Sequence, residues 1–224
     1  MSQNTTTEII DENAVIAKST KEDWIKIAID ILIRDGVEHV KVQVISKRLG
    51  VSRSSFYWFF KDIGELHDAL LSYWLARNTG PIIERAMRPA KNLTESVCNV
   101  FECWITPGQF DANLDMAVRV WARRELNVRS VVEQADTQRV EALTRMFARH
   151  GIGAEEAFIR ARVLYFTQIG YFALEVHDSQ EKRGEYLFNY LLVHMGSEPD
   201  RDAIEAYVRR YRASDHRLER PVTV

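Results

Sequence analysis

The feature that most limits the fold of this chain is the spacing of its apolar residues, which recur every three or four positions along most of its length. Ala28, Ile29 and Leu32 follow this spacing near the start, and Leu66 and Leu70 follow it further on. No segment shows the strict alternation that is typical of a half-buried strand. Five prolines and ten glycines are also few for an all-β protein of 224 residues. We therefore predict an all-α fold.

Glycines and capping residues divide the N-terminal part into three short helices. The first is expected to begin at Ser19, which has capping-box spacing to Glu22, and to end at Gly36. The second covers 43–49 and ends at Gly50. The third runs from Arg53 to about residue 60, with Ser52 as its N-cap. Two short helices joined by a tight glycine turn predict a helix-turn-helix.

The remaining residues predict a larger helical domain. A long helical pattern continues to about Met87, where Pro89 stops it, and Asn92 with Glu95 opens the next helix. Further helices are expected at 110–125, 129–149, 155–177, 182–195 and 200–213. The predicted organisation is a disordered arm at 1–18, a helix-turn-helix domain at 19–65, a helical domain at 66–213 and a tail at 214–224.

Several functional classes lack support in the sequence. No apolar run approaches the ~20 residues of a membrane span, and the first residues lack the features of a signal peptide, so we expect a cytoplasmic protein that does not enter a membrane. Cys98 and Cys103 are five positions apart in a helical pattern, which suits neither a zinc site nor a disulfide, and we interpret both as small buried hydrophobes. We expect no metal and no cofactor.

Charge is distributed unevenly along the chain. The formal net charge is −2, yet residues 42–61 contain four bases, Lys47, Arg48, Arg53 and Lys61, and no acid. A local basic field of this kind favours an anionic partner, although single surface bases are more often only solvated. Because this segment is also the predicted helix-turn-helix, the partner we expect is double-stranded DNA.

The third predicted helix has the residue types that a recognition helix requires. Arg53 can donate two hydrogen bonds to guanine, while Ser54 and Ser55 can bond base edges or phosphates without keeping the backbone out of the groove. Tyr57 and Trp58 follow Ser54 by three and four positions, so they share a face that points away from Phe56 and Phe60. Lys61 adds charge, and Gln43 can contact a phosphate or an adenine. The alternative is an amphipathic helix whose aromatic face is ordinary core.

Residues 21–70 resemble the DNA-binding domain of the tetracycline-repressor (TetR) family of bacterial transcriptional regulators. The resemblance depends on a helix that ends at Gly36, on Ile45-Ser46, on Gly50-Val51-Ser52, on Tyr57-Trp58-Phe59-Phe60 and on Ile63-Gly64-Glu65-Leu66. It implies that Tyr57 binds phosphate and that Val42, Gln43, Arg53, Ser54, Ser55 and Trp58 lie at the DNA surface. Phe59 and Ile63 replace a histidine and a lysine that commonly contact the backbone in this family. Two phosphate contacts of the family therefore lack their usual residues here, and Lys61 is the candidate to replace them; if it does not, fewer phosphate contacts would flatten the dependence of DNA binding on salt.

The resemblance also implies that the C-terminal helices form a homodimer and enclose a pocket for a small-molecule effector. Residues 155–195 have more apolar side chains than one helix face can bury, which predicts a partner chain. The expected interface residues are Tyr171, Phe172, Leu187, Tyr190 and Leu191. The expected pocket residues, which suit an apolar or aromatic effector but are more often ordinary core, are Trp74, Trp104, Met116, Trp121, Met146 and Phe166.

These observations predict a sequence-specific DNA-binding regulator, a repressor that an effector releases from a palindromic operator. One alternative is a helical interaction protein whose helix-turn-helix is purely structural. An enzyme is the other alternative, and we do not expect one. The six histidines are scattered and form no metal-binding pattern, and the sequence lacks a nucleophile elbow and a phosphate-binding loop.

Overall fold

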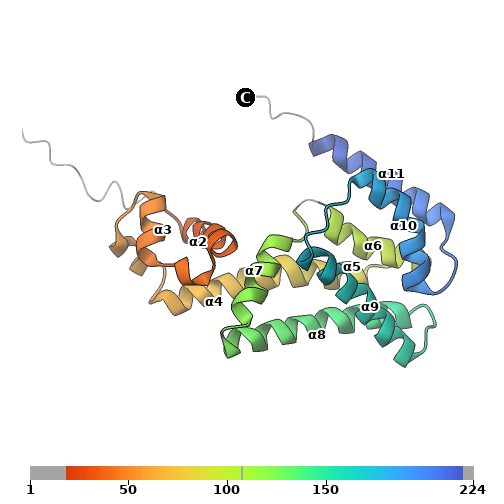
Figure 1. Ribbon diagram of the computed structural model, residues 1–224, viewed down its shortest axis with the longest axis horizontal. Coiled ribbons are helices and arrows are strands. Elements are labelled where there is room, and N and C mark those ends of the chain that lie inside the picture. Colours follow the sequence, from red (N-terminus) through yellow and green to blue (C-terminus); the bar gives the residue numbers. More distant parts are fainter. Residues whose placement is uncertain (1–18, 107, 219–224) are drawn as a thin grey trace, which may run out of the picture. The chain divides into compact units, whose positions relative to one another are not determined.

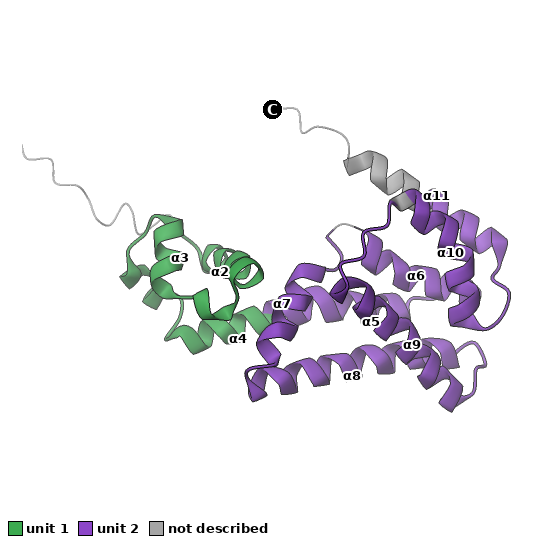
Figure 2. Cartoon of the chain, in the orientation of Figure 1, with its two compact units in different colours: residues 1–72 green, residues 73–224 purple. Residues whose placement is uncertain are grey.

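The computed structural model describes residues 19–106 and 108–218, and these residues form helices and no strand (Figure 1). The all-α prediction is confirmed. The chain divides into two compact units, residues 1–72 and residues 73–224 (Figure 2). The predicted domain boundary after residue 65 falls inside one helix, α4 (Ile63–Trp74). The predicted arm at 1–18 lies outside the described residues.

The first helix, α2 (Lys21–Asp35), begins one residue later than the sequence pattern suggested. The capping box consists of Thr20 and Asp23, because the Thr20 hydroxyl accepts from the Asp23 amide at 3.2 Å and the Asp23 carboxylate accepts from the Thr20 amide at 2.8 Å. The buried face of α2 includes Trp24 and Ile31, whereas the predicted Ile29 is only half-buried. Trp24 takes this position because its ring packs edge-on against Phe56, 5.4 Å away.

Glycines end the first two helices as predicted. Gly36, with φ of 87°, follows α2, and Gly50, with φ of 68°, follows α3 (Val42–Leu49). A short 3-10 turn, η1 (Val37–His39), connects the two helices. The left-handed conformation of Gly50 would be strained for most other residues, so this position fixes the turn of the helix-turn-helix.

The third element of this unit differs in type from the prediction. Residues Arg53–Trp58 form a 3-10 helix, η2, where the sequence predicted an α-helix to about Phe60. The hydroxyls of Ser52, Ser54 and Ser55 bond one another, and serine side chains of this kind compete with regular helical structure. The side-chain pattern is nevertheless as predicted. Phe56 and Phe60 are buried and stack with ring centroids 5.2 Å apart.

The long helical pattern after Asp62 is interrupted once. α4 is followed directly by a π-helical turn, η3 (Leu75–Thr79), and then by α5 (Gly80–Met87). Pro81 has no amide hydrogen to donate to the preceding turn, which favours such an irregularity. Asn78 in the turn is buried and exchanges two hydrogen bonds with the Asp111 backbone, at 2.8 and 3.1 Å. The sequence analysis did not anticipate this turn.

Six helices complete the second unit: α6 (Leu93–Ile105), α7 (Ala112–Ala122), α8 (Leu126–Ala148), α9 (Ala154–Ala173), α10 (Gln180–Met195) and α11 (Arg201–Leu218). All were predicted, with shifted ends. Asn92 caps α6 as expected, and its side chain accepts from the Glu95 amide at 2.9 Å. The last helix reaches Leu218, so it includes part of the predicted tail; residues 219–224 lie outside the described part of the chain.

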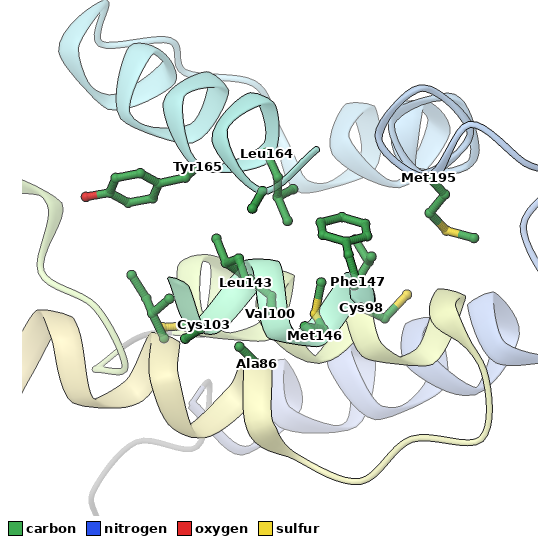
Figure 3. Packing of buried hydrophobic residues seen from close by; sticks show 14 of the residues in the cluster. Ala86, Cys98, Val100, Cys103, Leu143, Met146, Phe147, Leu164, Tyr165 and Met195 are labelled. Carbon is green, nitrogen blue, oxygen red and sulfur yellow. The ribbon is translucent and has the colours of Figure 1, made fainter. Parts of the chain in front are cut away.

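The core of the second unit lies where α8 packs along α9 and against α5. Figure 3 shows its members from several helices, among them Met146, Phe147 and Leu164. Cys98 and Cys103 are buried in this cluster as free thiols, which confirms the prediction that they are small buried hydrophobes. Among the described residues, no helix is long and apolar enough to cross a membrane.

Candidate functional site

The surface that the sequence assigned to DNA is exposed on the first unit. Tyr57 and Trp58 have 65% and 74% of their surface accessible, although the neighbouring Phe56 and Phe60 are buried. Arg53 and Ser54 are exposed at the start of η2. The 3-10 segment therefore separates its aromatic residues into a buried pair and an exposed pair, which an ordinary core helix with one aromatic face would not do.

Two further residues of α3 and one after η2 extend this surface. Gln43 and Lys61 are exposed, and Val42 is half-buried. Lys47, which the sequence analysis did not assign to the site, is also exposed and lies four positions after Gln43, so the two share a helix face. The i, i+4 spacing from Gln43 is the signal that could have found it. We use the name DNA surface for Val42, Gln43, Lys47, Arg53, Ser54, Tyr57, Trp58 and Lys61.

Ser55 differs from the other assigned residues because it is buried, with 2% of its surface exposed. Its hydroxyl lies 3.0 Å from that of Ser52, which in turn lies 2.7 Å from that of Ser54. Its burial argues against a direct contact with DNA. Ser55 instead helps to hold the Ser52 hydroxyl and, through it, the exposed Ser54 hydroxyl.

The basic residues of this unit are not equivalent. Arg48 is committed to two acids of α2, since its guanidinium lies 2.7 Å from Asp30 and 3.4 Å from Asp35. Within residues 19–106 and 108–218, Lys47, Arg53 and Lys61 form no ion pair with a carboxylate. Their charges remain available for an anionic partner.

The six predicted pocket residues differ in burial and in surroundings. Met146 belongs to the core of the second unit and Trp104 packs against that core. Trp74 and Trp121 are buried and Met116 is half-buried. Phe166 has 48% of its surface exposed and lies 5.2 Å from the Arg162 guanidinium. Trp74 contacts the buried ionic network that is described next.

A buried ionic network occupies the second unit, and the sequence analysis did not predict it. Arg139 on α8 and Asp115 on α7 both have fully buried side chains, and Arg139 Nη1 lies 3.2 Å from Asp115 Oδ1. Arg119 bonds both Asp115, at 2.8 Å, and Asp136, at 2.7 and 2.9 Å. Tyr165 donates its hydroxyl to Asp136 at 2.6 Å. We call these five residues the ionic network.

The environment holds these groups in defined charge states. Burial alone would raise the pKa of Asp115, but the charges of Arg139 and Arg119 and hydrogen bonds from Arg119 and Trp74 lower it. Burial raises the pKa of the Tyr165 hydroxyl. Asp115 is therefore a carboxylate and Tyr165 a neutral phenol at neutral pH. In Figure 3 the Tyr165 hydroxyl points away from the apolar cluster.

The positions of Arg139 and Asp115 carried a signal that could have revealed the network. Arg139 follows Ala135 by four positions and precedes Ala142 by three, so it falls on the buried stripe of α8. Asp115 precedes Val118 by three positions and falls on the buried stripe of α7. A charged residue on an apolar stripe indicates a buried ion pair or a binding site.

The predicted interface residues divide into two groups. Leu187 and Leu191 have 8% and 0% of their surface exposed and belong to the core of their own unit, which leaves little or none of their surface for a partner chain. Phe172 is half-buried and stacks on Phe110 with centroids 5.4 Å apart, and Tyr171 is half-buried. Tyr190 is 43% exposed. The pattern of apolar residues could not distinguish the inner from the outer face of α10 because both are apolar.

The exposed apolar side chains of α9 and α10 lie at other positions, which we call the outer face. They are Phe158, Ile159, Val163 and Phe166 on α9, and Tyr186, Tyr190, Leu192 and Val193 on α10. All eight have between 39% and 71% of their surface exposed. Exposed apolar side chains that gather on one surface are typical of an interaction site, so this set is a candidate for one.

Comparison with known proteins agrees with this geometry. Residues 25–70 match the family model described as bacterial regulatory proteins, tetR family. A transcriptional regulator from Rhodococcus sp. RHA1 has a similar fold, with a TM-score of 0.56 and 21% identity over 80% of this chain and 95% of that one. The reduced form of E. coli NemR gives a TM-score of 0.55 and 14% identity over 86% of this chain and 97% of its own. No curated protein matches significantly.

The chain thus has the architecture of a helix-turn-helix unit followed by a larger helical unit. The family match covers the helix-turn-helix alone, so residues 25–70 are similar to the DNA-binding part of tetR-family regulators. A putative regulator described as a TetR/AcrR family member shares the fold, with a TM-score of 0.54 and 14% identity over 87% of this chain and 97% of that one.

Proposed function

We propose that this chain is a transcriptional regulator of the tetR family, a homodimeric repressor that binds a palindromic operator and leaves it when a small apolar or aromatic effector binds the second unit. The observation that carries the proposal is the exposure of Arg53, Tyr57 and Trp58 in the segment that matches the family. Arg53 would read a base, Tyr57 would donate to a phosphate, and Trp58 would lie along the sugar-phosphate backbone. Such a protein works where the DNA is, which in bacteria is the cytoplasm.

Dimer formation is the second part of the proposal, and the outer face supports it. Two recognition segments about 34 Å apart would reach successive major grooves of a palindrome. Pairing the outer faces of two chains would bury the exposed apolar residues of α9 and α10 in a helical bundle. Arg162, whose guanidinium lies 5.4 and 5.2 Å from the Phe158 and Phe166 rings, would lie at the same interface.

Effector release is the third part. An effector that prefers one conformation of the second unit would act on α4, because that helix continues along the chain into the first unit. The required preference is modest, about 1–3 kcal/mol between the two conformations. Operator affinity measured with and without the effector tests this step, and an unchanged affinity would exclude it.

The function itself is tested by selecting fragments that the purified chain retains from random duplex DNA. We expect a palindromic consensus sequence. Its symmetry would support the proposed dimer as well as the proposed DNA binding. The alternative, a helix-turn-helix with a purely structural role, makes a different prediction for the double variant with Arg53→Ala and Tyr57→Ala. If that variant remained folded and bound duplex DNA as well as the parent chain, the structural alternative would hold.

A further inference from the structure

The Arg139 guanidinium is fully buried, yet only part of it is engaged. Its Nε donates to Thr79 Oγ1 at 3.1 Å, and its Nη1 donates to the Tyr165 hydroxyl at 2.7 Å and to Asp115 Oδ1 at 3.2 Å. Within the described residues, Nη2 has no hydrogen-bond partner. A guanidinium nitrogen of this kind has two hydrogens to donate, and burying them without an acceptor costs free energy.

Three aromatic rings lie close to the Arg139 guanidinium. The Arg139 guanidinium carbon lies 5.0 Å from the centre of the Trp74 ring, 5.9 Å from Tyr165 and 6.0 Å from Phe110. Phe110 in turn stacks on Phe172. These residues come from α4, from α9 and from the connection before α7, so several elements of the second unit converge on one buried cation. Rings arranged in this way favour a ligand with a flat apolar body.

The charges of the ionic network limit what the ligand can be. Arg119 and Arg139 are balanced by Asp115 and Asp136, and Tyr165 is neutral. An anionic ligand would leave this buried region with a net negative charge, which a low-dielectric environment opposes. A neutral group with an acceptor oxygen, such as a ketone, an aldehyde or an amide, would satisfy Nη2 without that penalty.

The π-helical turn η3 connects this position to the rest of the molecule. Its last two residues contact the network directly, since Thr79 accepts from Arg139 and Asn78 donates to Asp115 Oδ1 at 3.3 Å. Irregular turns of this type occur frequently at functional sites. Because η3 follows α4 without a break, a ligand that pulls on Arg139 would act on the end of the helix that leads into the first unit.

We propose that Arg139 anchors the effector, and that the effector is an uncharged aromatic compound whose carbonyl oxygen accepts a hydrogen bond from Nη2. This inference rests on the proposed function, because it assigns a chemical class to the effector of that same unit. The body of the effector lies against the rings of Trp74 and Phe110, and its oxygen accepts the hydrogen bond that Nη2 can donate.

The test uses the full chain and matched trios of compounds that differ at one group. The first trio is 2-acetonaphthone, its isostere 2-isopropenylnaphthalene and the anion 2-naphthoate; the second is acetophenone, α-methylstyrene and benzoate. Binding is measured by calorimetry and by quenching of tryptophan fluorescence. At least one ketone should bind about tenfold or more tightly than its hydrocarbon isostere, because a hydrogen bond to a charged donor is lost in the isostere. The anion should bind more weakly than the ketone.

Two variants locate the effect. Arg139→Lys keeps a cation beside Asp115 but removes Nη2, so the preference for the ketone should disappear. Arg85→Lys is the matched control, because Arg85 is a largely buried arginine that pairs with Glu102 outside the ionic network. It should keep the preference of the parent chain. If Arg139→Lys fails to fold, the comparison of ketone, hydrocarbon and anion within each trio on the parent chain still decides the chemical class of the effector.

Four results would overturn the inference: no ketone binds, the hydrocarbon binds as tightly as the ketone, the anion binds most tightly, or Arg139→Lys keeps the preference. DNA retention without any compound is measured on the same preparations and separates the two proposals. A chain that retains palindromic DNA but binds no ketone keeps the proposed function and loses the effector class. A chain that binds the ketone through Arg139 but retains no DNA does the reverse.

Discussion

Arg139 and Asp115 form an ion pair in which both side chains are fully buried, with Nη1 and Oδ1 3.2 Å apart. The two residues lie on α8 and α7, and Asp115 also accepts from the indole of Trp74 at 2.8 Å. A pair of this kind contributes little net stability compared with apolar residues of the same size, but the loss of one partner leaves the other charge buried and uncompensated. The stability of the second unit should therefore fall strongly when either residue of the pair is replaced alone.

Asp115→Asn should lower the free energy of unfolding by about 3–5 kcal/mol, because it leaves Arg139 buried without its principal counter-charge. Urea denaturation followed by circular dichroism measures the change. Glu141→Gln is the control, since Glu141 forms a solvent-exposed pair with Arg145 at 3.9 Å. That substitution should change stability by less than about 1 kcal/mol. Similar losses of unfolding free energy in the two variants would show that the burial of Asp115 does not determine how much stability is lost.

The same pair predicts a dependence on pH. The pKa of Asp115 is lower in the folded chain than in the unfolded chain, where a carboxyl of this type has a pKa near ~3.9. Its contribution to stability is therefore complete above about pH 4 and is lost as the pH falls through the folded-state pKa. Unfolding midpoints from pH 7 to pH 3 should fall more steeply in the parent chain than in Asp115→Asn. Parallel curves would contradict the assignment.

Features that depend on neighbouring residues could be predicted from the sequence better than features that depend on contacts between different helices. Gly36, Gly50 and the division of Phe56 from Tyr57 depend on neighbours within a few positions, and these predictions are confirmed. The ionic network joins residues on different helices, and only the placement of a charge on an apolar stripe hints at it. Leu187 and Leu191 were assigned to the interface because both faces of α10 are apolar, so periodicity alone could not show which face is covered.

The DNA surface predicts a change in sequence preference for one variant and a uniform loss for another. Arg53→Ala should weaken operator binding by about 1–3 kcal/mol and relax the preference at the base that Arg53 contacts. Tyr57→Phe removes one hydroxyl and should weaken binding to all sequences alike, because a phosphate carries no sequence information. Binding to the selected palindrome and to single-base variants of it measures both effects. Tyr73→Phe, at an exposed tyrosine of α4 that lies outside the DNA surface and the outer face, is the control and should bind like the parent chain.

Two adjacent bases on α3 provide a sharper test of the electrostatics. Lys47 forms no ion pair with a described carboxylate, whereas Arg48 is bound to Asp30 and Asp35. Lys47→Gln should therefore reduce the slope of log affinity against log salt by about 0.9, the value expected for one phosphate contact. Arg48→Gln should leave the slope nearly unchanged. Equal reductions in the two variants would show that the α2 acids do not withdraw Arg48 from DNA.

The two thiols should be unreactive in the folded chain. Burial raises the pKa of Cys98 and of Cys103 to about 12, so almost no thiolate is present at pH 8 and little reagent can reach it. Iodoacetamide at pH 8 should modify neither cysteine under native conditions and both in denaturant, as measured by intact mass. Rapid modification of the native chain would show that the core around α6 opens.

The outer face predicts which substitutions abolish the dimer. Val163→Glu and Val193→Glu place a charge among the exposed apolar residues of α9 and α10, where a partner chain would bury it at a cost of several kcal/mol. Each variant should be monomeric at concentrations at which the parent chain is dimeric, as measured by sedimentation or light scattering. Its stability as a monomer should change little, because both side chains are exposed in the single chain.

Leu126→Glu is the matched control for these variants. Leu126 is 79% exposed, more than Val163 at 45% or Val193 at 71%, but it lies at the start of α8 and outside the outer face. The substitution should leave the dimer intact, because exposure alone does not define the interface. A monomeric parent chain, or dimers that survive both valine substitutions, would remove the outer face from the proposal. In the monomeric variants operator affinity should fall steeply, since each chain would then reach a single half of the palindrome.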